Sequence, residues 1–383
     1  MAAGWGFARG KLLAAHGDNT TARRPIWLAA AAWGVLIVIW TCGRACLAEE
    51  CCPYGTDCGK QRLAEEAWAG YRDPGVVFLC QPPVPDYWTI DFRVRTLCSS
   101  ITSYEFGTPP DMPPPPPPAP AQWAPLSRLI FSLDSTWFGL QLAHETPEWG
   151  FRFEWMMAGQ YINNDVADFD WASPNPDGSF TDFGLARERF TEGQMIDIEY
   201  KRRLLVAPLG LPFDVWPLIG FRWQRFDITA FDLRQVKSDN VWLDPPFTFE
   251  DDVGTLNQEY YIGYAGLQLR GRWDIPKLCP ILWTLQGDWG HTEANDVDHH
   301  ILREGDMFIM NRTSGDCWHA GLTVEAVVTE HIGVGVQADQ LYINTRGTHR
   351  WLNEPLGIDE SWDNGVAVTS RQTWITAFLR IRM

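Results

Sequence analysis

The sequence lacks the long apolar runs that a bundle of membrane helices requires. Its mean hydropathy is -0.20, and one apolar run, the 15 residues from Ile26 to Trp40, is long enough to consider. Each membrane-spanning helix needs about 20 predominantly apolar residues. A helical bundle is therefore excluded, whereas a membrane β-barrel is not, because only alternate residues of its strands face lipid.

The sequence is also short of positive charge. It has 31 Lys and Arg against 48 Asp and Glu, which gives a net charge of -17 at pH 7. This balance argues against nucleic-acid binding and favours cationic partners where the carboxylates cluster. Aromatic residues, by contrast, are abundant, with 21 Trp, 20 Phe and 10 Tyr. Two explanations stay open, the aromatic girdles of a membrane barrel and a large aromatic core.

The apolar run near the amino end resembles the core of a secretory signal. Two arginines precede it at 23–24, and a small-residue cleavage site follows it at 46–48. We predict a signal peptide over 1–48, with an unusually long stretch before its apolar part.

A cysteine-containing segment follows at 49–91. Export would permit disulfides there, and no histidine accompanies the cysteines, so a stapled cap is favoured over a metal site. The clustered cysteines are Cys51, Cys52, Cys58 and Cys80.

From residue 92 to residue 383 the chain alternates apolar and polar residues with a period of two, which is typical of β-strands. The strands run to 14 residues or more, whereas soluble strands average about 5–6. A Pro-rich stretch at 108–122 is predicted to be a loop, because polyproline cannot pair in a sheet. The predicted strands are 92–106, 127–143, 149–164, 193–206, 216–231, 259–274, 280–293, 316–328, 331–346 and 366–382.

The connections between these strands alternate in length. Short ones lie near 144–148 and 329–330, and long ones near 165–192 and 232–258. Outer-membrane barrels have short periplasmic turns and longer outer loops. We therefore predict an all-β fold, a ten-stranded antiparallel transmembrane β-barrel with long extracellular loops. A soluble β-sandwich also alternates and is the alternative.

Two acidic motifs lie in the long connections. The first is Asp-Phe-Asp-Trp at 168–171, and the second is Asp-Val-Asp-His-His at 296–300. Continuing the alternation of the preceding strands turns Asp168 and Asp170 inward, and likewise Asp296, Asp298 and His300. A β-bulge would invert this prediction for the strand that carries it.

The two motifs together suit the activation of water. Neighbouring carboxylates shift each other's pKa, and an imidazole oriented by a carboxylate is a general base near neutral pH. A D-x-D motif alone is usually a solvated turn, and a site with a bound metal is the poorer interpretation. The other histidines, His319 and His349 among them, are interpreted as scattered surface residues.

These residues resemble the omptin family, ten-stranded outer-membrane endopeptidases, over roughly 92–383. The carboxy-terminal strand from Gly365 also matches in spacing. The resemblance rests on 168–171, Asn-Pro at 175–176, Phe-Thr-Asp at 180–182, Tyr-Ile-Gly at 261–263 and the acids and histidine of 296–300.

The resemblance implies roles for the catalytic residues. Asp298 would orient His300, His300 with Asp168 would polarise a water, and Asp170 would support Asp168. The water would attack a peptide bond next to a basic residue, with no metal and no other cofactor.

For substrate binding, the resemblance implies a pocket for a basic side chain formed by Asp296 and Glu105. Asp182 would favour a second basic residue beyond the scissile bond. Strand parity, counted with Arg93 and Arg95, predicts that Glu105 points inward.

The family also requires lipopolysaccharide, and Arg225 matches one of its basic lipid-binding positions. Asn257–Glu259, where a second such position falls, has no basic residue, so the resemblance at the lipid-binding positions is incomplete. The expected setting is a monomer in bacterial outer-membrane lipid, with its active site facing the exterior and with basic peptides or proteins as substrates. A barrel that only binds cationic peptides, as an adhesin or receptor, is the alternative.

Overall fold

The computed structural model describes residues 86–107, 127–159, 161–171, 180–206, 212–274 and 279–383. The predicted signal peptide, the clustered cysteines and the Pro-rich loop lie outside these residues. No helix within the described ranges is both long enough and apolar enough to cross a membrane.

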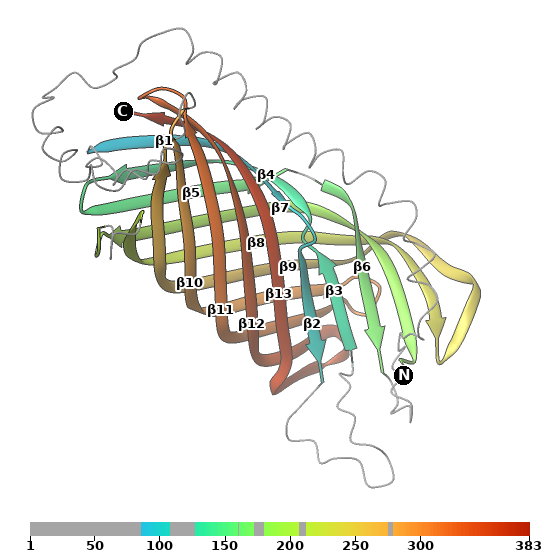
Figure 1. Cartoon of the computed structure of the whole chain (residues 1–383). Helices are drawn as coiled ribbons and strands as arrows, with labels where there is room; N and C mark the ends of the chain where they lie inside the picture. The colour runs from blue at the N-terminus through green and yellow to red at the C-terminus, as the bar shows by residue number, and fades with distance from the viewer. Residues whose placement is uncertain (1–85, 108–126, 160, 172–179, 207–211, 275–278) are drawn as a thin grey trace, which may run out of the picture.

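Strand segments within the described residues form one antiparallel sheet that closes on itself (Figure 1). Three barrel strands are each divided into two segments, β1/β2, β4/β3 and β5/β6, so the thirteen segments make a ring of ten strands. The ring closes through β13, which pairs with both β1 and β2, and through β7, which pairs with β8. The predicted ten-stranded antiparallel barrel is confirmed. The segments are β1 (Tyr87–Leu97), β2 (Ile101–Phe106), β3 (Ser127–Ser132), β4 (Ser135–Glu145), β5 (Trp149–Ala158), β6 (Tyr161–Asp170), β7 (Asp182–Arg202), β8 (Phe213–Ser238), β9 (Val241–Trp273), β10 (Ile281–His300), β11 (Met307–Val327), β12 (Ile332–Asn353) and β13 (Ile358–Arg382), with a short 3-10 helix, η2 (Glu354–Leu356).

The strands are longer than the sequence pattern predicted. Much of what was expected to be loop continues as strand, so the two acidic motifs lie on β6 and β10. The longest hairpin, β8–β9, turns through Asp239 and Asn240, whose φ angles of 48° and 67° suit a tight two-residue turn. Its tip is the yellow projection at the right of Figure 1.

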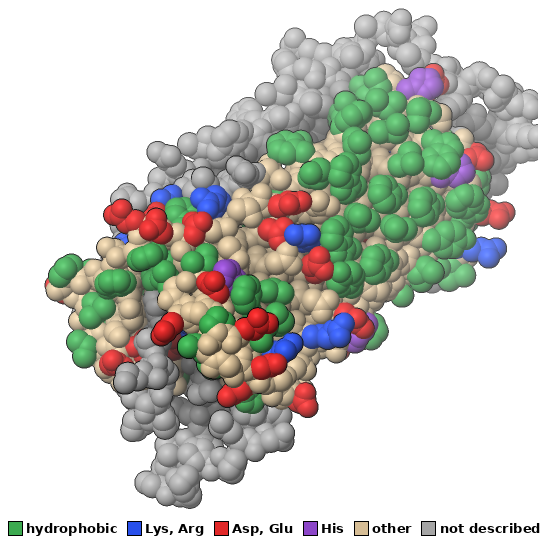
Figure 2. Space-filling model, turned by 180° about the vertical axis from the view of Figure 1, so that it is seen from behind, with side chains coloured by type: hydrophobic (Ala, Val, Ile, Leu, Met, Phe, Trp, Pro, Cys, Tyr) green, Lys and Arg blue, Asp and Glu red, His purple; other side chains and the backbone are tan. Residues whose placement is uncertain are grey.

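The outer face of the barrel is apolar over one half of its length. Figure 2 shows hydrophobic side chains gathered there, and charged side chains over the other half. On β10 the change comes after Trp289, because His291 and Glu293 follow on the same outward face. An apolar outer band is what a membrane barrel presents to lipid. The half beyond it, called the rim below, carries both acidic motifs.

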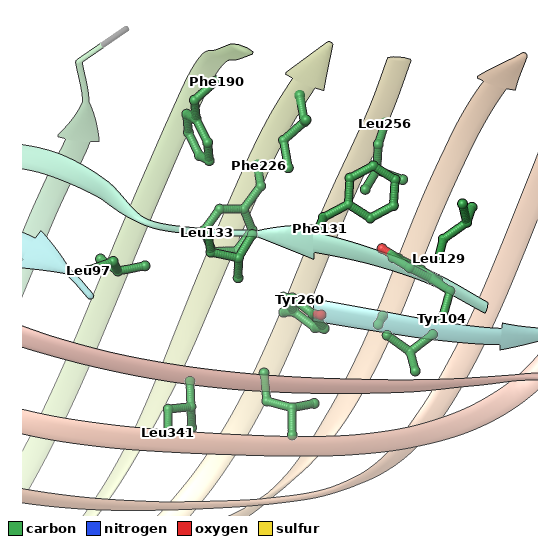
Figure 3. Close-up of a cluster of buried hydrophobic side chains, with 14 of the residues drawn as sticks. Leu97, Tyr104, Leu129, Phe131, Leu133, Phe190, Phe226, Leu256, Tyr260 and Leu341 are labelled. Carbon is green, nitrogen blue, oxygen red and sulfur yellow. The ribbon is translucent and has the colours of Figure 1, made fainter. Parts of the chain in front are cut away.

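Inside the apolar band, the lumen is filled by paired charges. Glu154 lies 2.9 Å from Arg93 and 2.6 Å from Arg95, and Asp197 lies 3.0 Å from Arg222. Towards the rim, a cluster of buried apolar side chains replaces the charges (Figure 3); it includes Leu97, Leu133, Phe190, Phe226, Tyr260 and Leu341. The candidate site is therefore supported from below by a packed core.

The division between β1 and β2 reverses which residues face inward. In β1 the odd-numbered residues are buried, whereas in β2 the even-numbered Thr102, Tyr104 and Phe106 are buried. Ser99, between the two segments, has a φ angle of +55°, a left-handed conformation that interrupts regular strand alternation. No residue pattern indicates this irregularity, because a serine does not ordinarily mark such a break.

Candidate active site

β6 carries Asp168 and Asp170 on its inward face. Asp168 is directly opposite Leu129 of β3, which is buried in the barrel core, and Asp170 is opposite Asp182 of β7. Residues directly opposite in an antiparallel pair project to the same side. The register of β6 with β7 shifts between Ile162 and Asn164. The parity at Asp168 and Asp170 is nevertheless the one predicted from the preceding strand.

β10 carries the second motif without any irregularity. Its even-numbered residues are inward from Gln286 to Asp298, and both Asp296 and Asp298 are buried. His300 follows at the end of the strand, with its Nε2 atom 3.0 Å from Oδ2 of Asp298. The predicted inward direction of these residues is confirmed, because the alternation continues unbroken through the motif.

The two acidic motifs lie within electrostatic range of each other across the mouth of the barrel. Burial raises the pKa of Asp168 well above its usual range, and the charge of Asp170 raises it further. Arg303, in the turn between β10 and β11, opposes this rise, and Asp298 adds to it. Since Asp298 belongs to the other motif, its effect on Asp168 shows that β6 and β10 bring their acids into one region. Such mutual effects require carboxylates within short range.

Asp296 lies deeper than Asp298 on the same strand. Its side chain accepts a hydrogen bond from Nδ2 of Asn311 at 2.5 Å. Burial raises the pKa of Asp296 well above its usual range; the hydrogen bond from Asn311 opposes that rise, and the charge of Asp298 adds to it. A buried acid with this environment favours a cationic neighbour, since an opposite charge would restore its ionised form.

Asp182 also faces the interior and is fully buried. Its Oδ1 atom accepts a hydrogen bond at 2.6 Å from the backbone N–H of Asp239, at the tip of the β8–β9 hairpin. Oδ2 of Asp182 has no hydrogen-bond partner among the described residues. The hairpin therefore fixes one oxygen of this acid and leaves the other without a donor.

Glu105 does not point into the barrel, and the prediction that it does is wrong. Its side chain is 37% exposed and lies 2.5 Å from Arg128, the residue directly opposite on β3. The physical reason is the reversal of parity at Ser99, which turns the odd-numbered residues of β2 outward. A pocket for a basic side chain formed by Asp296 and Glu105 together is not present in this structure.

Two neighbours of the acidic motif have other partners. His299 stacks on Phe308, with ring centroids 4.3 Å apart, and its Nε2 lies 3.4 Å from Asp306. Arg225, the predicted lipid-binding residue, lies on the outer parity of β8 and pairs with Asp227 at 2.9 Å. No group of three or more His, Cys, Asp or Glu side chains that could hold a metal ion occurs among the described residues.

The sequence reasoning missed three inward residues beside Asp296. They are Gln258 on β9, Asn311 on β11 and His349 on β12, and all three are buried. His349 was interpreted as a surface residue, and so was His319, which bridges Asp288 and Asp339 in the lumen. Extending the alternation of the strand at 316–328 back to Met307 would have turned Asn311 inward. These residues lie side by side because of the register in which neighbouring strands pair, and that register cannot be read from a single sequence.

The chain has the fold of the outer-membrane β-barrels, and the comparisons with known proteins support that class. Its sequence matches no protein-family model and no curated protein. Among solved structures it is similar to the outer membrane protease OmpT from Escherichia coli, with a TM-score of 0.61, 16% identity, and coverage of 80% of this chain and 100% of OmpT. It also aligns with the transport unit of the Escherichia coli autotransporter AIDA-I, with a TM-score of 0.28, 10% identity, and coverage of 82% and 95%. At 16% identity the likeness to OmpT shows the fold alone.

Proposed function

We propose that this protein is an endopeptidase of the bacterial outer membrane that cleaves peptides and proteins next to basic residues. One observation carries the proposal. An acid pair on β6 and an Asp–His pair on β10, more than a hundred residues apart in sequence, face the same interior, and the charge of Asp298 acts on Asp168. The similarity to OmpT, a protease with the same fold, supports this proposal.

In the proposed mechanism, Asp298 orients His300 through the 3.0 Å contact at Nε2. Nδ1 of His300 then accepts a proton from a water while the water oxygen adds to the peptide carbonyl carbon. Asp168, supported by Asp170, positions this water. When the tetrahedral intermediate collapses, His300 returns the proton to the leaving amine nitrogen. The peptide bond breaks without a covalent intermediate, and metal or cofactor chemistry has no part in the proposal.

The proposed substrates carry positive charge. Asp182 and Asp296 are inward acids, and one carboxylate oxygen of each has no hydrogen-bond partner in the part of the chain that the structure describes. The net charge of -17 gives the whole chain a field that attracts basic peptides. Glu105 is not assigned to this site, because it lies on the outer face.

The membrane setting is part of the same proposal. The apolar outer band fits lipid, and the rim beyond it would place the site outside the cell. We propose a monomer, since one chain closes the ring. Arg225 lies on the outer parity of its strand, where it could meet a lipopolysaccharide phosphate if its pairing with Asp227 were exchanged.

The test uses the full-length barrel refolded in detergent with lipopolysaccharide and a fluorogenic peptide that contains a dibasic pair. Asp168→Ala and His300→Ala are each expected to lower kcat by at least about 10²-fold, in line with the loss of general acid–base catalysis. Glu293→Ala is the matched control, because Glu293 lies on the outward face of β10. Unchanged turnover in both site variants would contradict the mechanism. Peptide binding without turnover in the wild-type protein, from pH 5 to pH 8, would instead support an adhesin or receptor.

A further inference from the structure

A row of four buried polar side chains crosses neighbouring strands at the level of Asp296. Gln258 of β9 is directly opposite Asp296, Asp296 is opposite Asn311, and Asn311 is opposite His349 of β12. Their exposures are 0%, 3%, 4% and 4%, respectively. Cβ atoms of such opposed residues lie about 4.5–5.5 Å apart, so the four side chains are neighbours along the row.

The hydrogen bonds in this row have only one consistent direction. The indole N–H of Trp351 is a donor and contacts Nε2 of His349, which must therefore be an acceptor. His349 is then neutral, with its proton on Nδ1, and donates to Oδ1 of Asn311 at 2.7 Å. The amide nitrogen of Asn311 is left to donate to Oδ2 of Asp296. The row therefore holds the amide N–H of Asn311 in place as a donor to Oδ2 of Asp296.

Aromatic rings keep His349 in this state. Phe106 lies 4.7 Å and Trp362 lies 5.7 Å from the imidazole, measured between ring centroids. Burial lowers the pKa of His349 to about 4, with Asp298 raising it and His300 lowering it by smaller amounts. Near neutral pH the ring is therefore uncharged, and the orientation of Asn311 is set.

Three buried oxygens at this level have no hydrogen-bond partner among the described residues. They are Oδ1 of Asp296, Oε1 of Gln258 and the hydroxyl of Tyr104. The amide nitrogen of Gln258 donates one of its two N–H groups to the hydroxyl of Tyr260, while its oxygen has no donor among the described residues. Tyr104 stacks on Phe106, which lies against His349 of the row. Burial raises the pKa of the Tyr104 hydroxyl well above its usual range, and the charge of Asp296 adds to that rise. Buried acceptors without donors are costly, and a ligand that supplies N–H groups would remove that cost.

We propose that this row makes the site selective for a lysine ammonium over an arginine guanidinium, an inference that rests on the proposed peptidase function. An ammonium is a compact charge whose three N–H groups can each meet a separate oxygen. A guanidinium binds best by a flat fork on both oxygens of one carboxylate. Oδ2 of Asp296 already accepts a hydrogen bond from Asn311, so the two oxygens of this carboxylate are not both available to a guanidinium. The other acceptors, on Gln258 and Tyr104, are single neutral oxygens and not a second carboxylate.

The depth of the row also requires a long side chain. Asp296 lies two residues below Asp298 on β10, a distance of about 7 Å at strand spacing. A peptide backbone at the level of Asp298 and His300 would need an unbranched stem of about that length to reach Asp296. Lysine meets this requirement and ends in the matching head group.

The experiment compares kcat/KM for two peptides that differ only by Lys or Arg before the scissile bond. We expect the wild-type barrel to prefer the Lys peptide by about 10-fold, equivalent to about 1.4 kcal/mol. Asn311→Ala removes the donor to Oδ2 of Asp296, and His349→Phe removes the group that orients Asn311, so each should reduce this ratio towards one, mainly through KM. His349→Asn retains a donor near the position of Nδ1 and should restore the preference in part. A wild-type preference for Arg would overturn the inference.

A binding measurement separates this inference from the proposed function. The Asp168→Ala barrel is titrated with fluorescent, otherwise identical Lys and Arg peptides, and anisotropy reports each Kd. Tighter binding of the Lys peptide, lost in Asp168→Ala combined with Gln258→Leu, supports the inference even if the wild-type protein cleaves neither peptide. Equal Kd values for the two peptides overturn it even if the protein is an active peptidase. Retained heat-modifiable migration of each variant on gels shows that the barrel has folded.

Discussion

The lumen and the rim both hold inward acids, but the two regions supply those acids with different partners. In the lumen, Glu154 meets the guanidinium groups of Arg93 and Arg95. At the rim, Asp296 instead accepts a hydrogen bond from the neutral amide of Asn311 and forms no ion pair with another described residue. The lumen therefore supplies its own opposite charges, whereas the rim would gain from charges that a ligand brings.

The energetic reason for this difference is the cost of burying charge. A buried ion whose partner is removed is strongly destabilising, so a membrane-level lumen without bulk water must pair its acids. The rim opens towards solvent at His300, whose side chain is 22% exposed. An apolar cluster, in which Leu133 and Phe226 are fully buried, separates the paired charges of the lumen from the acids of the site. The comparison teaches that unpaired acids, not acids as such, mark the candidate site.

The largest expected effect would come from breaking the pairing in the lumen. Glu154→Gln keeps the side-chain volume but leaves Arg93 and Arg95 without their shared anion. We expect the free energy of unfolding to fall by about 3–5 kcal/mol, as for other buried pairs that lose one partner. Urea unfolding in detergent, followed by tryptophan fluorescence, measures this. Asp296→Asn is the rim control and should leave the unfolding free energy unchanged or higher.

The next prediction locates the boundary between the two regions on the outer face by comparing two substitutions on β10. Leu285 and Val297 are both outward on β10 and are 47% and 38% exposed. Leu285→Arg places a charge in the apolar band and should cost about 2–4 kcal/mol in lipid vesicles, whereas Val297→Arg, beyond the band, should cost about 0–1 kcal/mol. Equal costs for the two substitutions would show that the band is not where the membrane lies.

A smaller effect concerns the pH dependence of stability at the rim. The pKa values of Asp168 and Asp296 are raised in the folded state. The folded protein therefore holds protons that the unfolded chain has released above about pH 4, and the unfolding free energy should fall as pH rises from there. Asp168→Asn and Asp296→Asn should each flatten this slope in urea titrations from pH 4 to pH 7. An unchanged slope in both variants would contradict the raised values.

His349 should have the opposite effect on the pH dependence of stability, between about pH 4 and pH 6.5. Its pKa is lowered to about 4 in the folded protein, against about 6.5 in an unfolded chain. The unfolded state then binds the proton first as pH falls, so stability from this group is lost between about pH 6.5 and pH 4. His349→Phe should remove that loss, and the difference between the variant and wild-type curves isolates it.

The smallest effect tests the corrected position of Glu105. Because Glu105 pairs with Arg128 on the outer face, Glu105→Gln should change kcat/KM by less than about twofold and stability by about 0–1 kcal/mol. Asp182→Asn is the inward control and should weaken cleavage of peptides with a second basic residue. A large loss of activity in Glu105→Gln would restore this residue to the substrate site.

Much of the barrel was predictable because lipid and lumen impose opposite preferences on alternate residues. The ten strands and the inward direction of Asp296 and Asp298 follow from that period of two, which is unbroken in β10. Asp168 and Asp170 have the predicted parity although the register of β6 with β7 shifts before them. The strand ends were less predictable, since β8 and β9 extend well past the apolar band, where the outward face becomes polar and the pattern fades.

The sequence by itself determined the closed antiparallel sheet and the inward acids of β6 and β10, because alternation is a local property that each strand carries in its own residues. Only the tertiary structure decided that Glu105 faces outward, through the left-handed backbone of Ser99. It also decided that Gln258, Asp296, Asn311 and His349 form one row. The register between strands is set when the ring closes, and it depends on all ten strands at once.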